Sequence, residues 1–263
     1  MMPGEERPDD PVGVFVAAVR ANRPASVLAL DFDGTLAEMV EDPAVAVPLP
    51  GAVAAVERAA SRWGEVAVVS GRPLRFLEGH LPAPEVTLVG LYGLEIRRAG
   101  SVSEHPDAAA WRAAVGRAVE LARESSLERV GIESKGASLT LHYRTARDQA
   151  PAVEEVARQI AAATGLLVRP AKLSIELHPP TSVDKGTAMA DLASRHPGPV
   201  GFVGDDLGDL PAFGVLSGLR STGRITLAAA VIGAETPAGV TAAADLVLDG
   251  PAGVLDLLDR LDQ

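Results

Sequence analysis

The sequence contains no cysteine, and aromatic residues make up only 3% of the chain. The absence of cysteine excludes disulfide bonds, thiolate metal sites and a thiol nucleophile. With so few aromatic side chains, a hydrophobic core has to be built from alanine, valine and leucine, which the 47% hydrophobic content allows. A length of 263 residues permits one large domain or two smaller ones.

Long apolar runs and an excess of positive charge are also lacking. No run approaches the roughly 18 residues that a membrane-spanning helix needs, and the opening MMPGEERPDDP is acidic and polar, unlike a signal peptide. We therefore expect a cytoplasmic protein that binds no membrane. The formal net charge of −11 argues against a nucleic-acid partner. It leaves room for a small anionic substrate, provided that lysine, arginine or a bound metal neutralises it locally. The sequence does not give the oligomeric state, and a monomer is favoured.

Two kinds of strand pattern are present, and the first is continuously apolar. It occurs as VLAL at 27–30, VAVV at 66–69 and GFV at 201–203, and it is typical of parallel strands covered on both faces. Helical patterns over 52–63 and 187–194 alternate with these strands. The alternation predicts βαβ units and an α/β fold with a doubly wound parallel sheet.

The second kind of strand alternates between apolar and polar residues, in SLTLHYR at 138–144 and LSIELH at 173–178. Such strands belong to a sheet with one solvated face. Apolar residues at helical spacing predict two helices in the same region. One precedes the first alternating strand, with Trp111, Val115, Val119 and Ala122, and the other lies between the two strands, with Val153, Val156 and Ile160. The region therefore reads as an α+β unit inserted into the α/β core. We predict an N-terminal lead with a short helix over 1–24, a core domain over 25–97 and 180–263, and a cap domain over 98–179.

Each continuously apolar strand ends in polar residues: DFDGT at 31–35, SGR at 70–72 and GDDLGD at 204–209. In an open α/β sheet, ligands bind beyond the carboxyl ends of the strands. If the three strands are parallel neighbours, seven polar residues converge there: Asp31, Asp33, Ser70, Arg72, Asp205, Asp206 and Asp209. The DG pair taken alone is more typical of a turn or a helix cap, and Asp206 fits a helix cap as well as it fits a metal ligand.

Several carboxylates in one place repel each other unless a cation lies between them. Mg²⁺ prefers oxygen ligands of this kind, so we predict a magnesium site with five candidate ligands: Asp31, Asp33, Asp205, Asp206 and Asp209. A carboxylate can also attack phosphorus and form an aspartyl-phosphate. Asp31 would be that nucleophile, and Asp33 would protonate the leaving oxygen and then activate water. Gly34 lets the backbone approach a phosphate, while Thr35 and Ser70 supply hydroxyl groups.

Lys185, in SVDKGTAMADL, is the candidate cation for a phosphate group. It falls at a predicted helix start, with Ser182 or Asp184 as the cap. A helix N-terminus favours anions, and the lysine would neutralise charge that develops on a phosphoryl group. A lysine at a helix start is otherwise a common solvated residue, and only its order among the other motifs favours the functional interpretation.

Taken together, these motifs resemble the haloacid-dehalogenase superfamily of phosphotransferases. That superfamily has an Asp-x-Asp pair, then Ser or Thr, then Lys, then a carboxylate pair. The matching residues here are Asp31 and Asp33, Ser70, Lys185, and Asp205 and Asp206 with Asp209. The α+β unit inserted between the Ser and the Lys motifs resembles the larger, C2-type cap of that superfamily. The resemblance implies a haloacid-dehalogenase-like core with such a cap.

Within that superfamily, the stretches LDFDGTLAEMVEDP, VVSGRP, GLYGLEIR, ESKGASLTLHYR, AKLSIELHP and VGDDLGDLPAF resemble the trehalose-6-phosphate phosphatases. The implied activity is Mg²⁺-dependent hydrolysis of trehalose 6-phosphate to trehalose and phosphate. The resemblance implies that five cap residues face the sugar: Lys135, His142, Arg144, Lys172 and Glu176. We count Gly34, Gly71 and Arg72 among the residues expected to contact the substrate. His142 and Arg144 on a polar strand face are also compatible with simple solvation.

The chain departs from the family pattern at three places. Tyr92 stands where many relatives have histidine, Gly208 and Leu210 fall in a run that is more acidic in relatives, and His178 stands where arginine is common. Other phosphosugars, such as sucrose phosphate or a mannosyl or glucosyl phosphoglycerate, are therefore alternative substrates. A phospho-accepting sensor without turnover is a further alternative, although it would need neither the inserted unit nor Asp33. A dehalogenase is a weaker one, since it has no use for the metal-type carboxylates.

Overall fold

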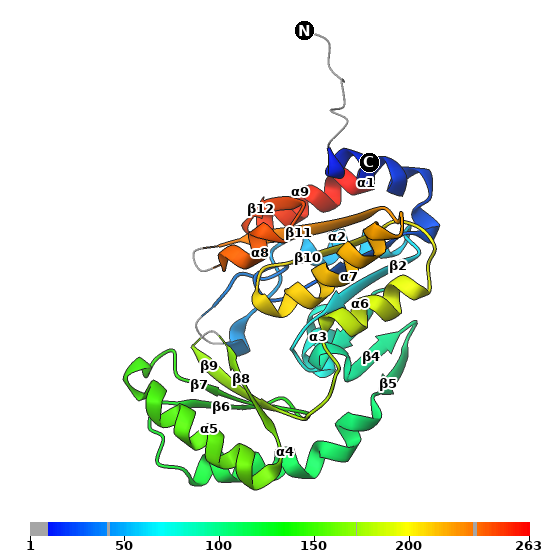
Figure 1. Ribbon diagram of the computed structural model, residues 1–263. Helices are drawn as coiled ribbons and strands as arrows, with labels where there is room; N and C mark the ends of the chain where they lie inside the picture. The colour runs from blue at the N-terminus through cyan, green and yellow to red at the C-terminus, as the bar shows by residue number, and fades with distance from the viewer. Residues whose placement is uncertain (1–9, 41–42, 172, 234–235) are drawn as a thin grey trace. The chain divides into compact units, whose positions relative to one another are not determined.

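The structure is a computed structural model, and it describes residues 10–40, 43–171, 173–233 and 236–263 (Figure 1). The chain forms two compact units. The first consists of Met1–Ser70, Leu74–Val102 and Val183–Gln263, and the second of Gly71–Pro73 and Ser103–Ser182. The second unit is thus inserted into the sequence of the first.

The first unit is built on an eight-stranded sheet with the order β12-β11-β10-β1-β2-β3-β4-β5. The strands from β12 to β3 are parallel, and β4 runs antiparallel to β3. The strands are β1 (Val27–Leu30), β2 (Glu65–Val69), β3 (Thr87–Gly90), β4 (Glu95–Arg98), β5 (Ser101–Glu104), β10 (Val200–Gly204), β11 (Thr226–Ile232) and β12 (Leu246–Asp249).

Helices cover both faces of the parallel strands. One face packs against α1 (Pro11–Ala21), α2 (Ala52–Ala60), α3 (Leu74–His80) and α9 (Gly250–Asp262). The other face packs against α6 (Lys185–Ser194), α7 (Leu210–Ser221) and α8 (Ala238–Ala242). The expectation of a doubly wound α/β core is confirmed, including helices at the places where the sequence predicted α1, α2 and α6.

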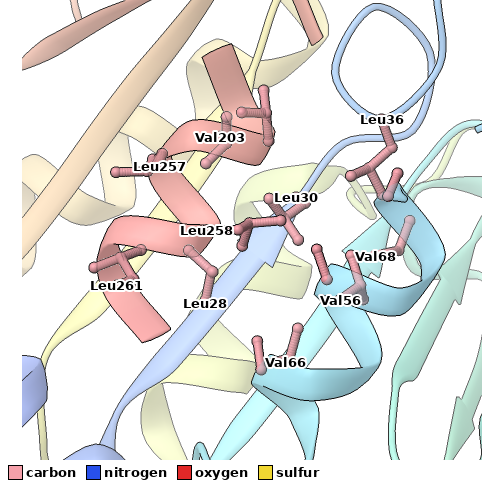
Figure 2. Close-up of a cluster of buried hydrophobic side chains, with 14 of the residues drawn as sticks. Leu28, Leu30, Leu36, Val56, Val66, Val68, Val203, Leu257, Leu258 and Leu261 are labelled. Atoms are coloured by element: carbon pink, nitrogen blue, oxygen red, sulfur yellow. The ribbon is translucent and has the colours of Figure 1, made fainter. Parts of the chain in front are cut away.

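The side chains of β1 show why its apolar run is continuous. Leu28 and Leu30 point to the face covered by α2 and α9, where Leu258 of α9 and Val56 of α2 meet them (Figure 2). Val27 and Ala29 enter the opposite cluster, with α6 and α7. Because both faces of the strand are buried, every one of its positions has to be apolar.

The strand order reverses direction between β1 and β10. From β1 the chain winds outward through β2 and β3, whereas β10, β11 and β12 extend the sheet on the other side of β1. The carboxyl ends on either side of such a reversal leave room for a ligand. The polar stretches after β1 and β10 are therefore neighbours at the switch point of the sheet.

The second unit contains a four-stranded sheet with the order β6-β7-β9-β8. Its strands are β6 (Gly131–Ser134), β7 (Leu139–His142), β8 (Leu167–Ala171) and β9 (Ser174–His178), all paired antiparallel. Two helices, α4 (Pro106–Glu124) and α5 (Ala150–Thr164), cover one face side by side (Figure 1). Leu139, Leu141, Ile175 and Leu177 point into that face.

Short 3₁₀ turns complete the described elements. They are η1 (Arg23–Ala25), η2 (Pro43–Val45), η3 (Leu91–Gly93), η4 (Arg147–Gln149) and η5 (Leu207–Asp209). Two of them, η3 after β3 and η5 after β10, follow strands of the parallel sheet at their carboxyl ends.

Candidate active site

The segment after β1 holds Asp31 by backbone contacts. The Asp31 N–H donates to the Val203 carbonyl oxygen of β10 at 2.8 Å, which ties the two strand ends together. Phe32 is fully buried and packs edge-on against Phe76, with ring centroids 5.4 Å apart. The Leu36 N–H then donates to the Phe32 carbonyl oxygen at 2.9 Å, which closes the turn. The buried anchor fixes Asp31, which is itself only 4% exposed.

The segment after β10 is organised by Asp209. One of its carboxylate oxygens accepts the N–H groups of Asp205 at 2.8 Å and Asp206 at 3.0 Å. This carboxylate lies against the Gly204 backbone, where a methyl group would overlap it. Asp206 caps η5, because its side chain accepts the Gly208 N–H at 2.8 Å. Asp209 therefore shapes the turn that presents Asp205.

Lys185 is the first residue of α6, and it links the two acidic segments. Asp184, rather than Ser182, caps the helix through a reciprocal pair of hydrogen bonds with Thr187. The Lys185 ammonium lies 2.8 Å from Asp31 Oδ2 and 2.6 Å from Asp209 Oδ1. All three side chains are almost completely buried, so one cation is shared between two carboxylates away from water.

Asp205 completes a cluster of carboxylates from two strand ends. One oxygen each of Asp31, Asp205 and Asp209 lies within 4.8 Å of the others. The Asp205 carboxylate also sits against Gly34, whose φ of +76° is left-handed and whose Cα leaves no room for a methyl group. The acidic segments after β1 and β10 therefore meet, whereas the convergence of Ser70 and Arg72 with them stays a prediction.

The charges in this cluster do not balance. Burial raises the pKa of Asp31 well above its usual range, and Lys185 opposes that effect only in part. Burial likewise raises the pKa of Asp209, and it raises that of Asp205 to about 8 with the help of the Asp206 and Asp209 charges. Burial alone would lower the pKa of Lys185, but Asp209 and Asp31 raise it well above its usual value. The surplus negative charge calls for a further cation.

Two predicted hydroxyl groups belong to the segments that follow β1 and β2. Ser70 directly follows β2, the parallel neighbour of β1, and is 1% exposed. The Thr35 side chain is fully buried, and its hydroxyl has no hydrogen-bond partner among the described residues. Asp33 is half-buried in the same turn as Thr35. The first unit thus contributes Asp31, Asp33, Gly34, Thr35, Ser70, Lys185, Asp205, Asp206 and Asp209.

The remaining predicted residues fall in the second unit or outside the described part. Gly71 and Arg72 belong to the short segment grouped with the second unit, and Arg72 is buried. Lys135 and Arg144 are half-buried. Lys172 lies outside the described residues.

The polar face of the second sheet carries His142 and Glu176. Strand pairing places Glu133, Thr140, Glu176 and Arg169 in one row across the four strands. Glu176 accepts a hydrogen bond from the Ser138 hydroxyl at 2.8 Å. An Arg169 guanidinium nitrogen lies 3.5 Å from the other Glu176 oxygen.

The expectation of a solvated polar face is wrong at the centre of this sheet. Ser138, Thr140, Ser174 and Glu176 are all less than 9% exposed, whereas His142, at the end of β7, is half-buried. The hydrogen bond and the ion pair of Glu176 allow this, since a buried carboxylate is tolerated when it has partners. Alternation alone reports that a face is polar and does not report whether water reaches it.

Sequence reasoning missed Glu133, the partner of His142. Glu133 Oε2 lies 2.8 Å from His142 Nε2. Burial by itself would raise the pKa of Glu133, but the hydrogen bond with His142 and the Lys135 charge lower it below the usual value. A signal was available in the sequence, because the alternating apolar residues Val130 and Ile132 place Glu133 on the opposite, polar face of a strand.

No helix in the described part of the chain is long and apolar enough to cross a lipid bilayer.

Comparison with known proteins identifies relatives of this chain. The profile of the trehalose-phosphatase family matches residues 29–238. Trehalose-phosphate phosphatase of Mycobacterium ulcerans is 32% identical over 204 residues, which cover 72% of this chain and 51% of that protein. The Mycobacterium bovis protein of the same name is 32% identical over 243 residues, covering 88% and 60%. The chain thus spans about half to three-fifths of the length of the curated relatives it matches.

Solved structures show the same fold. A trehalose-6-phosphate phosphatase related protein superposes with a TM-score of 0.75 at 20% identity, covering 90% of this chain and 96% of that one. The C-terminal domain of Candida albicans trehalose-6-phosphate phosphatase gives 0.74 at 22% identity, with 95% and 96% covered. A haloacid dehalogenase-like hydrolase from Bacteroides thetaiotaomicron gives 0.61 at 17% identity, with 89% and 98% covered. The fold is therefore haloacid-dehalogenase-like, as the sequence predicted.

The family profile extends over most of the chain, including the acidic segments after β1 and β10, the Ser70 position and Lys185. The buried carboxylates and the lysine lie together at the switch point of the sheet, and they follow one another in the sequence in the order of the family motifs. On this evidence the chain belongs to the trehalose-phosphatase family.

Proposed function

We propose that this chain is a phosphatase that hydrolyses trehalose 6-phosphate to trehalose and inorganic phosphate. The observation that carries the proposal is the buried arrangement of Asp31, Lys185 and Asp209 next to Asp205, in a chain of the trehalose-phosphatase family. A buried carboxylate at a strand end, paired with a lysine and close to a surplus of negative charge, suits a nucleophile that accepts a phosphoryl group.

In this proposal, an Asp31 carboxylate oxygen attacks phosphorus and the ester P–O bond breaks. The leaving sugar oxygen takes a proton from Asp33. Asp33 then accepts a proton from a water molecule that attacks the aspartyl-phosphate, which releases phosphate and restores Asp31. The Lys185 ammonium, 2.8 Å from Asp31 Oδ2, stabilises the negative charge that develops on the phosphoryl oxygens. The Thr35 and Ser70 hydroxyls are hydrogen-bond donors for the same group.

The donor set fits a hard divalent cation. All candidate donors are oxygens, and the raised pKa values of Asp31 and Asp205 indicate that the cluster lacks positive charge. Asp209 already uses one oxygen for two backbone N–H groups and the other for Lys185. We therefore propose Asp31 and Asp205 as Mg²⁺ ligands together with the Asp33 carbonyl, and Asp209 as the residue that holds Lys185. Bound Mg²⁺ would supply neutralisation and orientation of the phosphate.

The second unit would contribute sugar contacts. The polar row with Glu176, and the neighbouring His142, offer acceptors and donors that suit a polyhydroxylated ligand, and Lys135, Arg144 and Lys172 stay predicted contacts. All reacting groups of the proposal come from one unit of one chain, so a monomer suffices. The cytoplasmic location rests on the sequence and stays a prediction.

The test is phosphate release from trehalose 6-phosphate by the full chain, with Mg²⁺ and with a chelator. Sucrose phosphate, a glucosyl phosphoglycerate and a generic aryl phosphate complete the panel. We expect kcat/KM to be highest for trehalose 6-phosphate, and we expect Asp31→Asn and Asp33→Asn to abolish turnover. Equal activity on the aryl phosphate would refute the substrate assignment. Stable phosphorylation of the native chain without release would favour a phospho-accepting sensor instead.

A further inference from the structure

The loop from Ser70 to Leu74 connects β2 to α3, and both of its ends are held by the same hairpin. The hairpin consists of β3, η3 and β4, which follow in sequence and pair antiparallel, with Gly90 opposite Glu95. Within the proposed function, this loop carries a hydroxyl donor for the phosphoryl group. Its geometry therefore matters for binding phosphate, and the hairpin is a candidate for setting that geometry.

The entry to the loop is fixed through the backbone of Ser70. The Ser70 N–H donates to the Val89 carbonyl oxygen at 2.9 Å, and the Tyr92 N–H donates to the Ser70 carbonyl oxygen at 2.9 Å. Both backbone groups of Ser70 are thus bonded to the β3–η3 segment. The position of the Ser70 side chain follows from the shape of the turn that carries Tyr92.

The turn that makes this contact is strained. Leu91 and Tyr92 have φ values of +49° and +62°, in the left-handed region that side chains disfavour. Two consecutive residues of this kind persist only where the surrounding structure requires the turn, and such positions cluster at functional sites. Gly93 follows with φ of +125°, and a methyl group on it would lie 2.8 Å from Val183 Cγ1, two residues before Lys185.

The exit of the loop is fixed by a side chain. Glu95 Oε2 accepts the N–H of Leu74, the first residue of α3, at 2.6 Å. A carboxylate at this place bonds a donor that has no partner inside the helix, and it lies at the positive end of the helix dipole. The interaction spans 21 residues of sequence, so it is a tertiary clamp and not a local cap.

We propose that Glu95 is a positioning residue for the reaction. With the Tyr92 N–H, its carboxylate clamps the Ser70–Leu74 loop at both ends, so that the Ser70 hydroxyl is held beside Asp31 at the ends of neighbouring strands. Glu95 acts through Leu74 and Ser70 and touches no reacting atom. Loss of the clamp lets the loop exit move, and binding of the phosphoryl group weakens in both the ground and the transition state.

The test compares three substitutions at Glu95 with one control substitution, all in the full chain. In Glu95→Ala and Glu95→Asp, which remove or withdraw the acceptor oxygen, we expect KM and the inhibition constant of orthophosphate to rise about 10- to 100-fold, with a smaller change in kcat. Glu95→Gln keeps an acceptor at the right distance and is expected to stay within about threefold of the native values. Glu85→Ala, at an exposed carboxylate that precedes the same hairpin, is the matched control and leaves both constants unchanged.

Amide hydrogen exchange over residues 70–80 gives a second readout that does not depend on catalysis. We expect faster exchange at this segment in Glu95→Ala and Glu95→Asp than in Glu95→Gln or Glu85→Ala. If Glu95→Ala does not fold, Glu95→Asp carries the comparison. Native exchange and native constants in Glu95→Asp would overturn the proposal, as would equal losses in Glu95→Gln and Glu95→Asp. A native chain that hydrolyses no phosphate ester would refute the proposed function, while the exchange result still decides whether the clamp exists.

Discussion

Mg²⁺ binding to the metal-free protein is expected to release protons, because Asp205 holds one at neutral pH. Burial and the charges of Asp206 and Asp209 raise the pKa of Asp205 from 3.8 to about 8. At pH 7 this carboxyl group therefore carries about 0.9 proton, and at pH 9 about 0.1. A carboxylate has to be deprotonated to bind a metal ion, so the proton leaves as Mg²⁺ enters.

Isothermal titration calorimetry measures this count. Mg²⁺ is titrated into the protein in several buffers of different ionisation enthalpy at one pH, and the slope of observed heat against ionisation enthalpy gives the protons released. Asp205 alone accounts for about 0.9 at pH 7, with a fall of about 0.8 by pH 9. Any proton from Asp31 or Asp209 adds to the count, since burial raises the pKa of both. Fewer than about half a proton at pH 7, or a count that does not fall by pH 9, would refute the reasoning.

The same linkage predicts how stability depends on pH. The pKa of Asp205 is higher in the folded state than its ordinary value of 3.8. Its contribution to the free energy of unfolding is therefore fully present below about pH 4 and is lost as the pH rises through about 8. Mg²⁺ stabilises the folded protein by binding the deprotonated Asp205 carboxylate, and at pH 5 it has to displace a proton first. The rise in Tm on adding Mg²⁺ should therefore be larger at pH 8 than at pH 5. Asp259→Asn, at an exposed residue, is the control and should change neither measurement.

Three further predictions concern the same buried cluster. Asp31→Asn should lower kcat roughly 10³-fold or more. It should not lower the Tm of the metal-free protein, because it removes one of the excess carboxylates. A Tm lowered by several degrees would contradict the charge argument. Lys185→Met leaves Asp31 and Asp209 without their cation. The free energy of unfolding, measured with denaturant, should fall by about 3–5 kcal/mol at pH 7 and by less at pH 4. An unchanged denaturant midpoint would count against the ion pairs. Gly204→Ala forces a methyl group onto the Asp209 carboxylate and should cost about 1–3 kcal/mol. Gly214→Ala in α7 meets nothing within 4 Å, so it should be neutral or stabilising, and equal thermal melts of the two glycine variants would argue against the close contact.

The core strands could be predicted where burial on both faces made the sequence continuously apolar. β1, β2 and β10 were found for that reason, and the acidic stretches after them located the switch point. β11 was not identified, although it is the longest strand of the sheet, because its centre is alanine, which has little preference for strands. β8 includes Pro170, a residue that usually argues against a strand and is tolerated here at the edge of the second sheet.

The site could be predicted as a set of residues but not as a set of contacts. The sequence placed Asp31 and Asp205 together because parallel strands end at one edge of a sheet, and it added Lys185 through the order of the motifs. Nothing in the sequence shows that Asp209 uses both of its oxygens before any metal arrives, since this depends on how tightly the turn after Gly204 closes. Glu95 stays hidden for the same reason, because its partner is 21 residues away and is set by the register of β4.

The neighbouring positions of β1 and β10 have a consequence for synthesis of the protein. These strands pair directly although about 170 residues separate them, and the whole second unit is made in the interval. A growing chain can therefore complete the inserted unit while β1 still lacks its partner on one side. Assembly of the parallel sheet waits for residues 200–204 to emerge, and the carboxylate–lysine cluster cannot form before Asp209 has been made.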